Sequence, residues 1–184
     1  MAMRLNNQRG YTLGELLTTM GVMGILSAVA IPGMQSMVNN NRRVTMTNDL
    51  SYTMHVARSE AITRNQQITV CPSTNQLTCN GDDWSDGWIV FTDIDQSRAP
   101  NDDEQVLLTN KGTDGVDVYT AVFDGSFTYR PNGRIMAESF AENTGQFTIC
   151  DARGADQARV LVIASSGRPR VSETQPDGSD PNCS

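Results

Sequence analysis

The first forty residues contain the longest apolar run in the chain. From Gly10 to Pro32 the sequence reads GYTLGELLTTMGVMGILSAVAIP, with one acidic residue, Glu15, and no basic residue. A helix rises about 1.5 Å per residue, so residues 11–31 in helical form span roughly 30 Å, which is about the thickness of a bilayer's hydrocarbon core. The pattern predicts a helix that crosses a membrane, and we assign residues 11–34 to it.

Helical periodicity continues beyond the membrane segment. Apolar residues three or four positions apart form one narrow stripe, at Leu50, Met54, Ala57 and Ala61. This spacing predicts a helix over residues 35–64 whose stripe packs against a sheet. His55 lies beside the stripe and is the only histidine of the chain, so we interpret it as a surface or capping residue.

After residue 66 the pattern changes to short apolar runs separated by Gly, Asn, Asp and Pro, which predicts a β-rich region over residues 67–184. The expected strands are Ile68–Cys71, Trp88–Thr92, Val106–Thr109, Val116–Phe123, Phe127–Arg130, Phe147–Cys150 and Val160–Ala164. One long helix followed by strands indicates the α+β class, with an antiparallel sheet packed on the helix. Residues 35–184 would then form one globular domain.

Composition narrows the function classes. The 184 residues suffice for one domain with a core, and 21 acidic against 14 basic residues give a net charge of −7. This acidic excess argues against general nucleic-acid binding, although a local arginine cluster can still bind phosphate. The sequence has no nucleophile with a matched base, no glycine-rich phosphate loop and no cluster of His with Cys. We therefore expect no enzymatic activity, no cofactor and no metal site.

Four cysteines, Cys71, Cys79, Cys150 and Cys183, suit a disulfide framework in an exported domain. Four cysteines allow three connectivities, and four reduced thiols in a cytosolic protein are the alternative. We favour the sequential pairing, Cys71–Cys79 and Cys150–Cys183. The first bond would close a short loop and the second would fix the polar tail, contributing about 2.6 and about 3.8 kcal/mol in the chain-entropy account.

The residues before the apolar run include Arg4 and Arg9 and no acid. Positive charge before an apolar helix keeps the N-terminus in the cytoplasm, so the domain that follows is exported. A secretory signal with an Ala28-Val29-Ala30 cleavage site is one interpretation, but Glu15 interrupts its apolar region. A plain signal anchor is the second interpretation, and the third comes from the junction itself.

The junction, RGYTLGELL, resembles the N-terminal motif of type IV prepilins and type II secretion pseudopilins. That motif has a short basic leader, Gly, an aromatic residue, Thr-Leu, an apolar residue, Glu and a long apolar helix. Here Tyr11 replaces the usual Phe, and Gly14 replaces a bulky apolar residue. The resemblance implies a leader over residues 1–10, cleavage after Gly10 by a prepilin peptidase, and N-methylation of Tyr11.

The chemistry of the segment suits this resemblance. An acid in the middle of a membrane costs roughly 2.5–3.5 kcal/mol, and a new amine at Tyr11 of one subunit could neutralise Glu15 of a neighbour during assembly. Small residues on the helix, Gly21, Gly24 and Ala28, allow close helix packing. Pro32-Gly33 predicts a kink or local melting.

Several further segments resemble the family of FimT/FimU minor pilins and the H-type pseudopilin: ARSEAI (57–62), Cys71-Pro72, WSDGW (84–88), CDARG (150–154) and Ser166-Gly167-Arg168. The family implies a long N-terminal helix on an antiparallel β-domain. It further implies an inner-membrane protein with a periplasmic domain that later joins a type IV pilus. The expected role is a structural minor pilin, in a tip complex that primes assembly. Expected partners are other pilins, the prepilin peptidase and the inner-membrane assembly platform; an H-type pseudopilin of type II secretion is an alternative.

The segment Gly167-Arg168-Pro169-Arg170 suggests another role, because Pro169 predicts an edge strand or extended arm that places Arg168 and Arg170 on one side. Two guanidinium groups there suit adjacent phosphates. FimT-like members act in DNA uptake for natural transformation, and a similar Gly-Arg-x-Arg motif is associated with that role. DNA is therefore a candidate partner.

The opposing interpretation is an edge strand whose arginines pair with carboxylates against another pilin. Glu173, Asp177 and Asp180 follow closely and would repel phosphate. The sequence does not decide whether Arg134 and Arg153 lie near this segment.

Residues 93–104 match a calcium-loop spacing in part, with Asp93, Asp95, Ser97, Asn101 and Glu104 at ligand positions. However, Arg98 stands where the sharp turn favours Gly, and no helix pair flanks the loop. We interpret these residues as a solvated hairpin loop.

Overall fold

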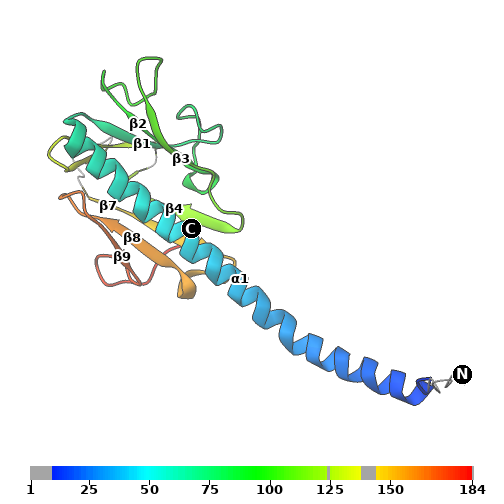
Figure 1. Ribbon diagram of the computed structural model, residues 1–184. Helices are drawn as coiled ribbons and strands as arrows, with labels where there is room; N and C mark the ends of the chain where they lie inside the picture. Colours follow the sequence, from blue (N-terminus) through cyan, green and yellow to red (C-terminus); the bar gives the residue numbers. More distant parts are fainter. Residues whose placement is uncertain (1–9, 124, 138–143, 184) are drawn as a thin grey trace, which may run out of the picture. The chain divides into compact units, whose positions relative to one another are not determined.

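The helix α1 (Leu13–Arg64) is 52 residues long and is the one α-helix in the residues described below (Figure 1). The computed structural model describes residues 10–123, 125–137 and 144–183. By its contacts the chain divides into two units, Met1–Val38 and Asn39–Ser184. The helix ends at Arg64, where the sequence pattern predicted.

In the first unit, α1 continues through Pro32 without interruption, so the local melting predicted there is not present in the single chain. Proline removes one backbone N–H and thus one helical hydrogen bond, and the flanking turns keep the rest of the ladder. Every residue from Gly10 to Val38 is exposed.

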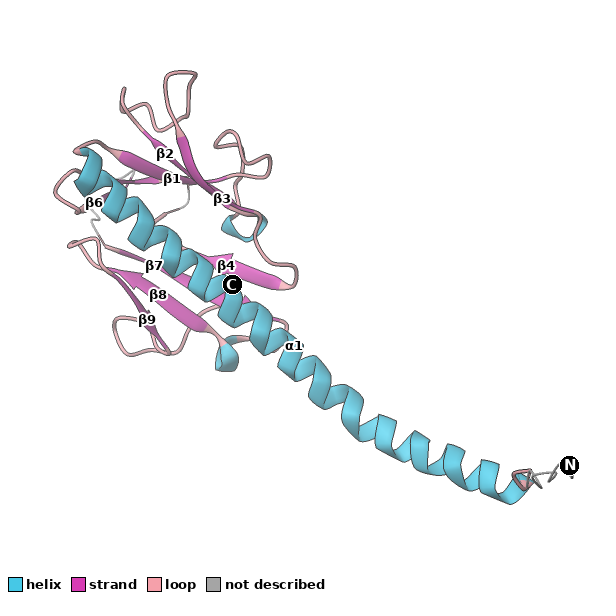
Figure 2. Ribbon diagram, viewed as in Figure 1, coloured by secondary structure: helices cyan, strands magenta, loops and turns pink. Residues whose placement is uncertain are grey.

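The second unit confirms the α+β class and divides the strands between two antiparallel sheets (Figure 2). The five-stranded sheet has the order β3-β2-β1-β5-β6 and the four-stranded sheet the order β4-β7-β8-β9. The strands are β1 (Ile68–Pro72), β2 (Trp88–Thr92), β3 (Val106–Asn110), β4 (Val116–Tyr119), β5 (Phe127–Tyr129), β6 (Ile135–Ala137), β7 (Gly145–Asp151), β8 (Arg159–Ile163) and β9 (Pro169–Ser172). Each strand predicted from the apolar runs is present.

Two strands differ from expectation. The run expected over Val116–Phe123 ends as a strand at Tyr119, and Phe123 instead packs in the aromatic core. The strand β6 was not predicted, because three residues are too few for an alternating pattern. The predicted edge strand at Pro169 is present as β9, which pairs only with β8 among the described strands.

The core of this unit joins the helix to both sheets (Figure 1). The predicted apolar stripe of α1, at Leu50, Met54, Ala57 and Ala61, is fully buried, and Met46 extends it by one turn. Two indole groups fix the helix and a loop: Trp88 Nε1 donates to Thr53 Oγ1 at 2.9 Å, and Trp84 Nε1 donates to the Phe123 carbonyl at 2.7 Å. Burial of each large side chain stabilises the fold by roughly 1.5–3 kcal/mol.

The WSDGW segment has a structural role. Trp84–Asp86 forms a short 3-10 helix that Asp83 caps by accepting the Ser85 N–H. Gly87 follows with φ of 122°, and a Cβ there would lie 2.3 Å from the Asn110 carbonyl oxygen. Only glycine therefore fits at position 87, directly before the buried Trp88.

The disulfides are Cys71–Cys79 and Cys150–Cys183, the sequential pairing. Their Cα atoms lie 5.5 Å and 6.0 Å apart. The first closes the loop after β1, and the second ties the tail to the buried strand β7. Both bonds lie within the second unit.

We expect the two disulfides to contribute unequally to stability. Replacing Cys150 and Cys183 by Ser should lower the free energy of unfolding by about 3.8 kcal/mol, because the bond closes the longer loop; the same change at Cys71 and Cys79 should cost about 2.6 kcal/mol. Urea unfolding of the full chain in uncharged detergent measures both. An equal or reversed order would contradict the loop-length argument.

Candidate functional site

The start of α1 is closed by a reciprocal pair of hydrogen bonds between Thr12 and Glu15. The Glu15 N–H donates to the Thr12 hydroxyl at 3.3 Å, and the Thr12 N–H donates to the Glu15 carboxylate at 3.0 Å. The Thr12 hydroxyl also donates to that carboxylate, at 3.2 Å. This arrangement is a capping box, which satisfies two backbone donors that a helix start leaves open. The T-x-x-E spacing of Thr12 and Glu15 is the sequence signature of such a cap, and it was not among the predicted features.

Gly10 and Tyr11 precede this cap and are exposed; Tyr11 is 89% exposed. The helix that follows displays large apolar side chains around its whole surface, including Leu16, Leu17, Met20, Met23, Ile25, Leu26, Val29 and Ile31. By length and composition α1 can cross a membrane near its N-terminus. A helix that is apolar on all sides requires lipid or other helices around it.

Within the second unit, residues from three elements line a cavity of about 400 Å³, which we call the arginine pocket. Its lining residues are Arg58, Asn132, Arg134, Ser165, Ser166 and Arg168. Arg58 belongs to α1, Arg134 lies between β5 and β6, and Arg168 lies between β8 and β9. The structure therefore brings Arg134 to Arg168, a proximity that the sequence left open.

Arg170 and Arg153 are not among the residues that line this pocket. Arg168 precedes β9, whereas Arg170 is an exposed residue inside β9, in register with Val162. Arg153 is held elsewhere, by a fork of hydrogen bonds to Asp151. Of the two arginines that the sequence spacing put together, Arg168 lines this pocket and Arg170 does not, and the spacing gave no indication of Arg58.

The Asp151 carboxylate is buried, and Arg153 donates to it from Nε at 2.9 Å and from Nη2 at 2.6 Å. These bonds from the Arg153 side chain hold the pKa of Asp151 below its usual value. Arg43 is also buried, and burial together with the charges of Arg159 and Arg153 lowers its pKa.

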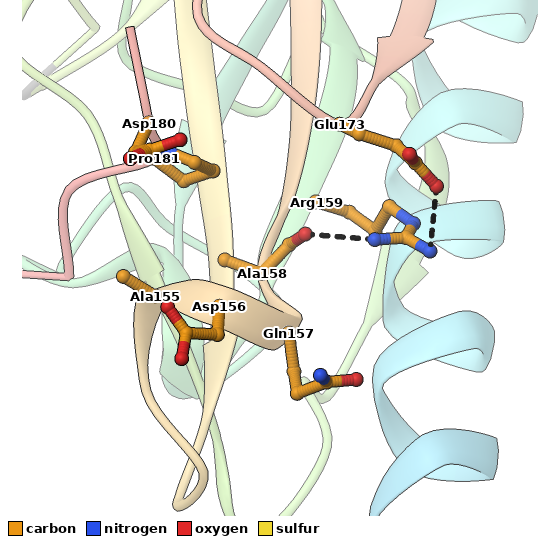
Figure 3. A pocket seen from close by; sticks show the side chains of 8 residues that line it. All are labelled: Ala155, Asp156, Gln157, Ala158, Arg159, Glu173, Asp180 and Pro181. Carbon is orange, nitrogen blue, oxygen red and sulfur yellow. Dashed lines mark hydrogen bonds and ion pairs between the residues drawn. The ribbon is translucent and has the colours of Figure 1, made fainter.

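A second cavity, of about 440 Å³, lies beside the start of β8 (Figure 3). There Arg159 donates to the Ala158 carbonyl at 3.0 Å and pairs with Glu173 at 3.1 Å. Asp180 lines the same cavity, and Asp177 accepts hydrogen bonds from Ser179. The three acids expected to repel phosphate from Arg168 are thus held at other positions, and none lines the arginine pocket.

The acidic loop brings single oxygens of Asp93, Asp95 and Glu104 within 4.8 Å of one another. These carboxylates already accept protein donors: Asp93 from the Thr69 hydroxyl at 2.6 Å and Glu104 from the Ile94 N–H at 2.6 Å. The Ser97 side chain and backbone lower the pKa of Asp95 by hydrogen bonding.

Arg98 has a φ of 60°, so the loop makes the sharp turn that the calcium pattern requires with an arginine in the glycine position. The side-chain amide of Asn101 donates to the Asp95 carboxylate at 3.0 Å, so this carboxylate already accepts a hydrogen bond from within the loop. These contacts suit a loop held by its own hydrogen bonds.

The chain is similar to known proteins in sequence and in fold. The family model described as "Type II transport protein GspH" matches residues 46–167. Two crystal structures of the type IV minor pilin FimU of Pseudomonas aeruginosa are similar, at 19% identity. Their TM-scores are 0.53 and 0.54. The two matches cover 74% and 77% of this chain and 95% and 93% of the FimU chains. The minor pseudopilin EpsH of Vibrio cholerae gives 0.48 at 9% identity, covering 71% of this chain and 95% of its own.

We expect Asp151→Asn to lower the free energy of unfolding by about 1–3 kcal/mol at pH 7, because it removes a buried acceptor of charged donors. The folded pKa of Asp151 lies below the unfolded value, so its stabilisation is present above the unfolded pKa. It is lost as the pH falls through the folded pKa, so the two proteins should converge in acid.

Urea titration at several pH values measures this difference. Asp117→Asn, an exposed residue on the adjacent strand β4, is the matched control and should change stability by less than about 0.5 kcal/mol. A difference at Asp151 that persists unchanged in acid would contradict the assignment.

Proposed function

The chain belongs to the family of the type II transport protein GspH, and from this premise we propose that it is a minor pilin. In this proposal it is a non-catalytic structural subunit that prepilin peptidase cleaves after Gly10. The processed subunit joins a type IV pilus, in a tip complex that primes assembly. The observation that supports this most directly is the helix start, where the exposed Tyr11 directly precedes the Thr12–Glu15 cap.

Cleavage would leave a positive amine at Tyr11, four positions before Glu15. In the single chain the Glu15 carboxylate has Thr12 as its local partner, so the acid is hydrogen-bonded before any assembly. During docking, the positive Tyr11 amine of a neighbouring subunit pairs with the negative Glu15 carboxylate, which the Thr12 hydrogen bonds leave charged. This pairing offsets a cost of roughly 2.5–3.5 kcal/mol for an acid at mid-membrane, and it makes the membrane state less favourable than the assembled one.

The exposed apolar helix supplies the rest of the docking surface. Gly21 and Gly24 have open space where a Cβ would stand, so helices can approach closely there. We infer membrane anchorage by this segment, a periplasmic second unit held by its disulfides, and assembly with major and minor pilins at the cell surface through an inner-membrane platform. An H-type pseudopilin of type II secretion is the rival: loss of twitching in a deletion strain indicates a pilus, and loss of protein secretion indicates the rival.

We expect the protein from cells to begin at N-methylated Tyr11. We also expect Glu15→Gln to be incorporated into pili at roughly one tenth of the normal level or less, because the neutral amide cannot pair with the amine. Mass spectrometry of the N-terminus and quantification in sheared pili measure the two outcomes.

Glu60→Gln is the matched control, since Glu60 lies on the same helix and pairs with Arg64 in the second unit. It should be processed and incorporated normally. A start at Met1 or at Ile31, or normal incorporation of the Glu15 variant, would overturn the proposal.

A second candidate function is DNA capture during uptake, through Arg168 and Arg170. The favouring observation is that, among the residues that the structure describes, no carboxylate lines the cavity to which Arg168 belongs. Two to four phosphate contacts predict a log–log salt slope of roughly −2 to −4.

We expect Arg168→Ala with Arg170→Ala to remove most DNA binding in a gel shift of the full chain in uncharged detergent. Arg42→Ala with Arg64→Ala changes the charge equally at exposed positions that do not line the pocket, and it should bind as the unmodified chain does. Unchanged binding by the first variant would exclude this site.

A further inference from the structure

The arginine pocket joins parts of both sheets and the helix. The β5–β6 turn belongs to the five-stranded sheet and the β8–β9 turn to the four-stranded sheet. Arg58 reaches from α1 and donates from Nε to the Gly133 carbonyl at 3.2 Å. Each of the three elements thus contributes one arginine to a single cavity.

Two glycines bring the turns together. Gly133 and Gly167 both have φ of 74°, and a Cβ on Gly167 would lie 2.0 Å from the Gly133 carbonyl oxygen. A Cβ on Gly133 would lie 3.2 Å from two nitrogens of Arg58. The position of the arginines therefore depends on a close backbone contact, which keeps the donors in place before any ligand arrives.

Hydrogen-bond donors exceed acceptors at this junction. The side chains of Arg134 and Arg168 make no hydrogen bond or ion pair with a residue in the described ranges, and Arg58 uses one of its donors. Asn132, Ser165 and Ser166 add further donors to the lining.

Tyr129 lies beside this junction, in the core, and is not among the residues that line the pocket. Its hydroxyl is buried and has no partner among the described residues. Its ring stands 2.9 Å from where a Cβ of Gly167 would be, and its hydroxyl is close enough to Arg58 for that charge to oppose the effect of burial on its pKa.

We propose that the arginine pocket binds a phosphate group. A carboxylate has two oxygens, and one guanidinium fork can satisfy both of them. Three guanidinium groups from three parts of the chain offer enough donors for a tetrahedral oxyanion, which has three or four acceptor oxygens. The phosphate is either free in the periplasm or part of a nucleic-acid backbone. The proposal does not require the pilus role, and it rests on the second candidate function only where the phosphate belongs to DNA.

The pocket makes a different residue prediction from the Gly-Arg-x-Arg motif. Arg58 and Arg134 belong to it, although they lie far from the motif in sequence, whereas Arg170 does not line it. Arg42 is exposed and does not line the pocket, so Arg42→Gln is a control matched in charge.

The test titrates inorganic phosphate into the full chain in uncharged detergent, by calorimetry at constant ionic strength set with chloride. We expect saturable binding of one phosphate per chain. Arg134→Gln and Arg58→Gln should each weaken it roughly tenfold or more, and Arg42→Gln should retain it. Arg58 also bonds Gly133, so Arg134→Gln, an exposed residue, keeps the test valid if the Arg58 variant fails to fold.

No saturable phosphate binding by the unmodified chain would overturn the proposal, and so would an equal loss in Arg134→Gln and Arg42→Gln. A single-stranded oligonucleotide then identifies the source. Oligonucleotide binding that Arg134→Gln loses and Arg42→Gln keeps supports a nucleic-acid phosphate. If the chain binds inorganic phosphate but no oligonucleotide, the ligand is free phosphate. That result excludes the DNA function and leaves the phosphate proposal intact.

Discussion

The helix α1 is built for two different surroundings along its length, and the rest of the structure depends on this constraint. From Leu13 to Val38 its large apolar side chains are exposed on every side. In the second unit one buried apolar stripe ends at Ala61, and the exposed positions are mostly polar, with Val44, Tyr52 and Ile62 as exposed apolar residues. A helix of the first kind requires lipid or other helices, whereas one of the second kind requires a sheet to cover one face.

The β-region meets the second requirement by covering the stripe with two sheets. Small residues, Ala57 and Ala61, lie in the stripe beside bulkier ones, and the aromatic side chains of the sheets fill the remaining volume. The disulfide at Cys150 then holds the polar tail, which has few apolar side chains of its own, to this core. Stability of the second unit therefore resides within residues 39–184, which leaves the apolar segment available for lipid or for other helices.

Local patterns in the sequence predicted most of this fold. The end of α1 at Arg64, the strands with clear apolar runs and the edge strand at Pro169 all follow from spacing and from turn residues. Pairing between strands did not follow, because β1 bonds to β5 across a long stretch of chain and the division into two sheets depends on such contacts. Arg58 was missed for the same reason: its partner Gly133 is 75 positions away, and no local pattern connects them.

Net charge was the weakest guide to where an anion could bind, because the acids and the arginines are distributed differently in space. Many acids are held close to their own place in sequence: Asp95 and Asp177 accept the N–H two residues on, and Asp151 pairs with Arg153. These local bonds hold negative charge within individual loops and turns. The arginines of the pocket come from distant elements, and no carboxylate within the described ranges 10–123, 125–137 and 144–183 lines the pocket with them. A chain with a net charge of −7 can therefore present a positive cavity, since a ligand responds to the groups within a Debye length, about 8–10 Å, rather than to the sum over the chain.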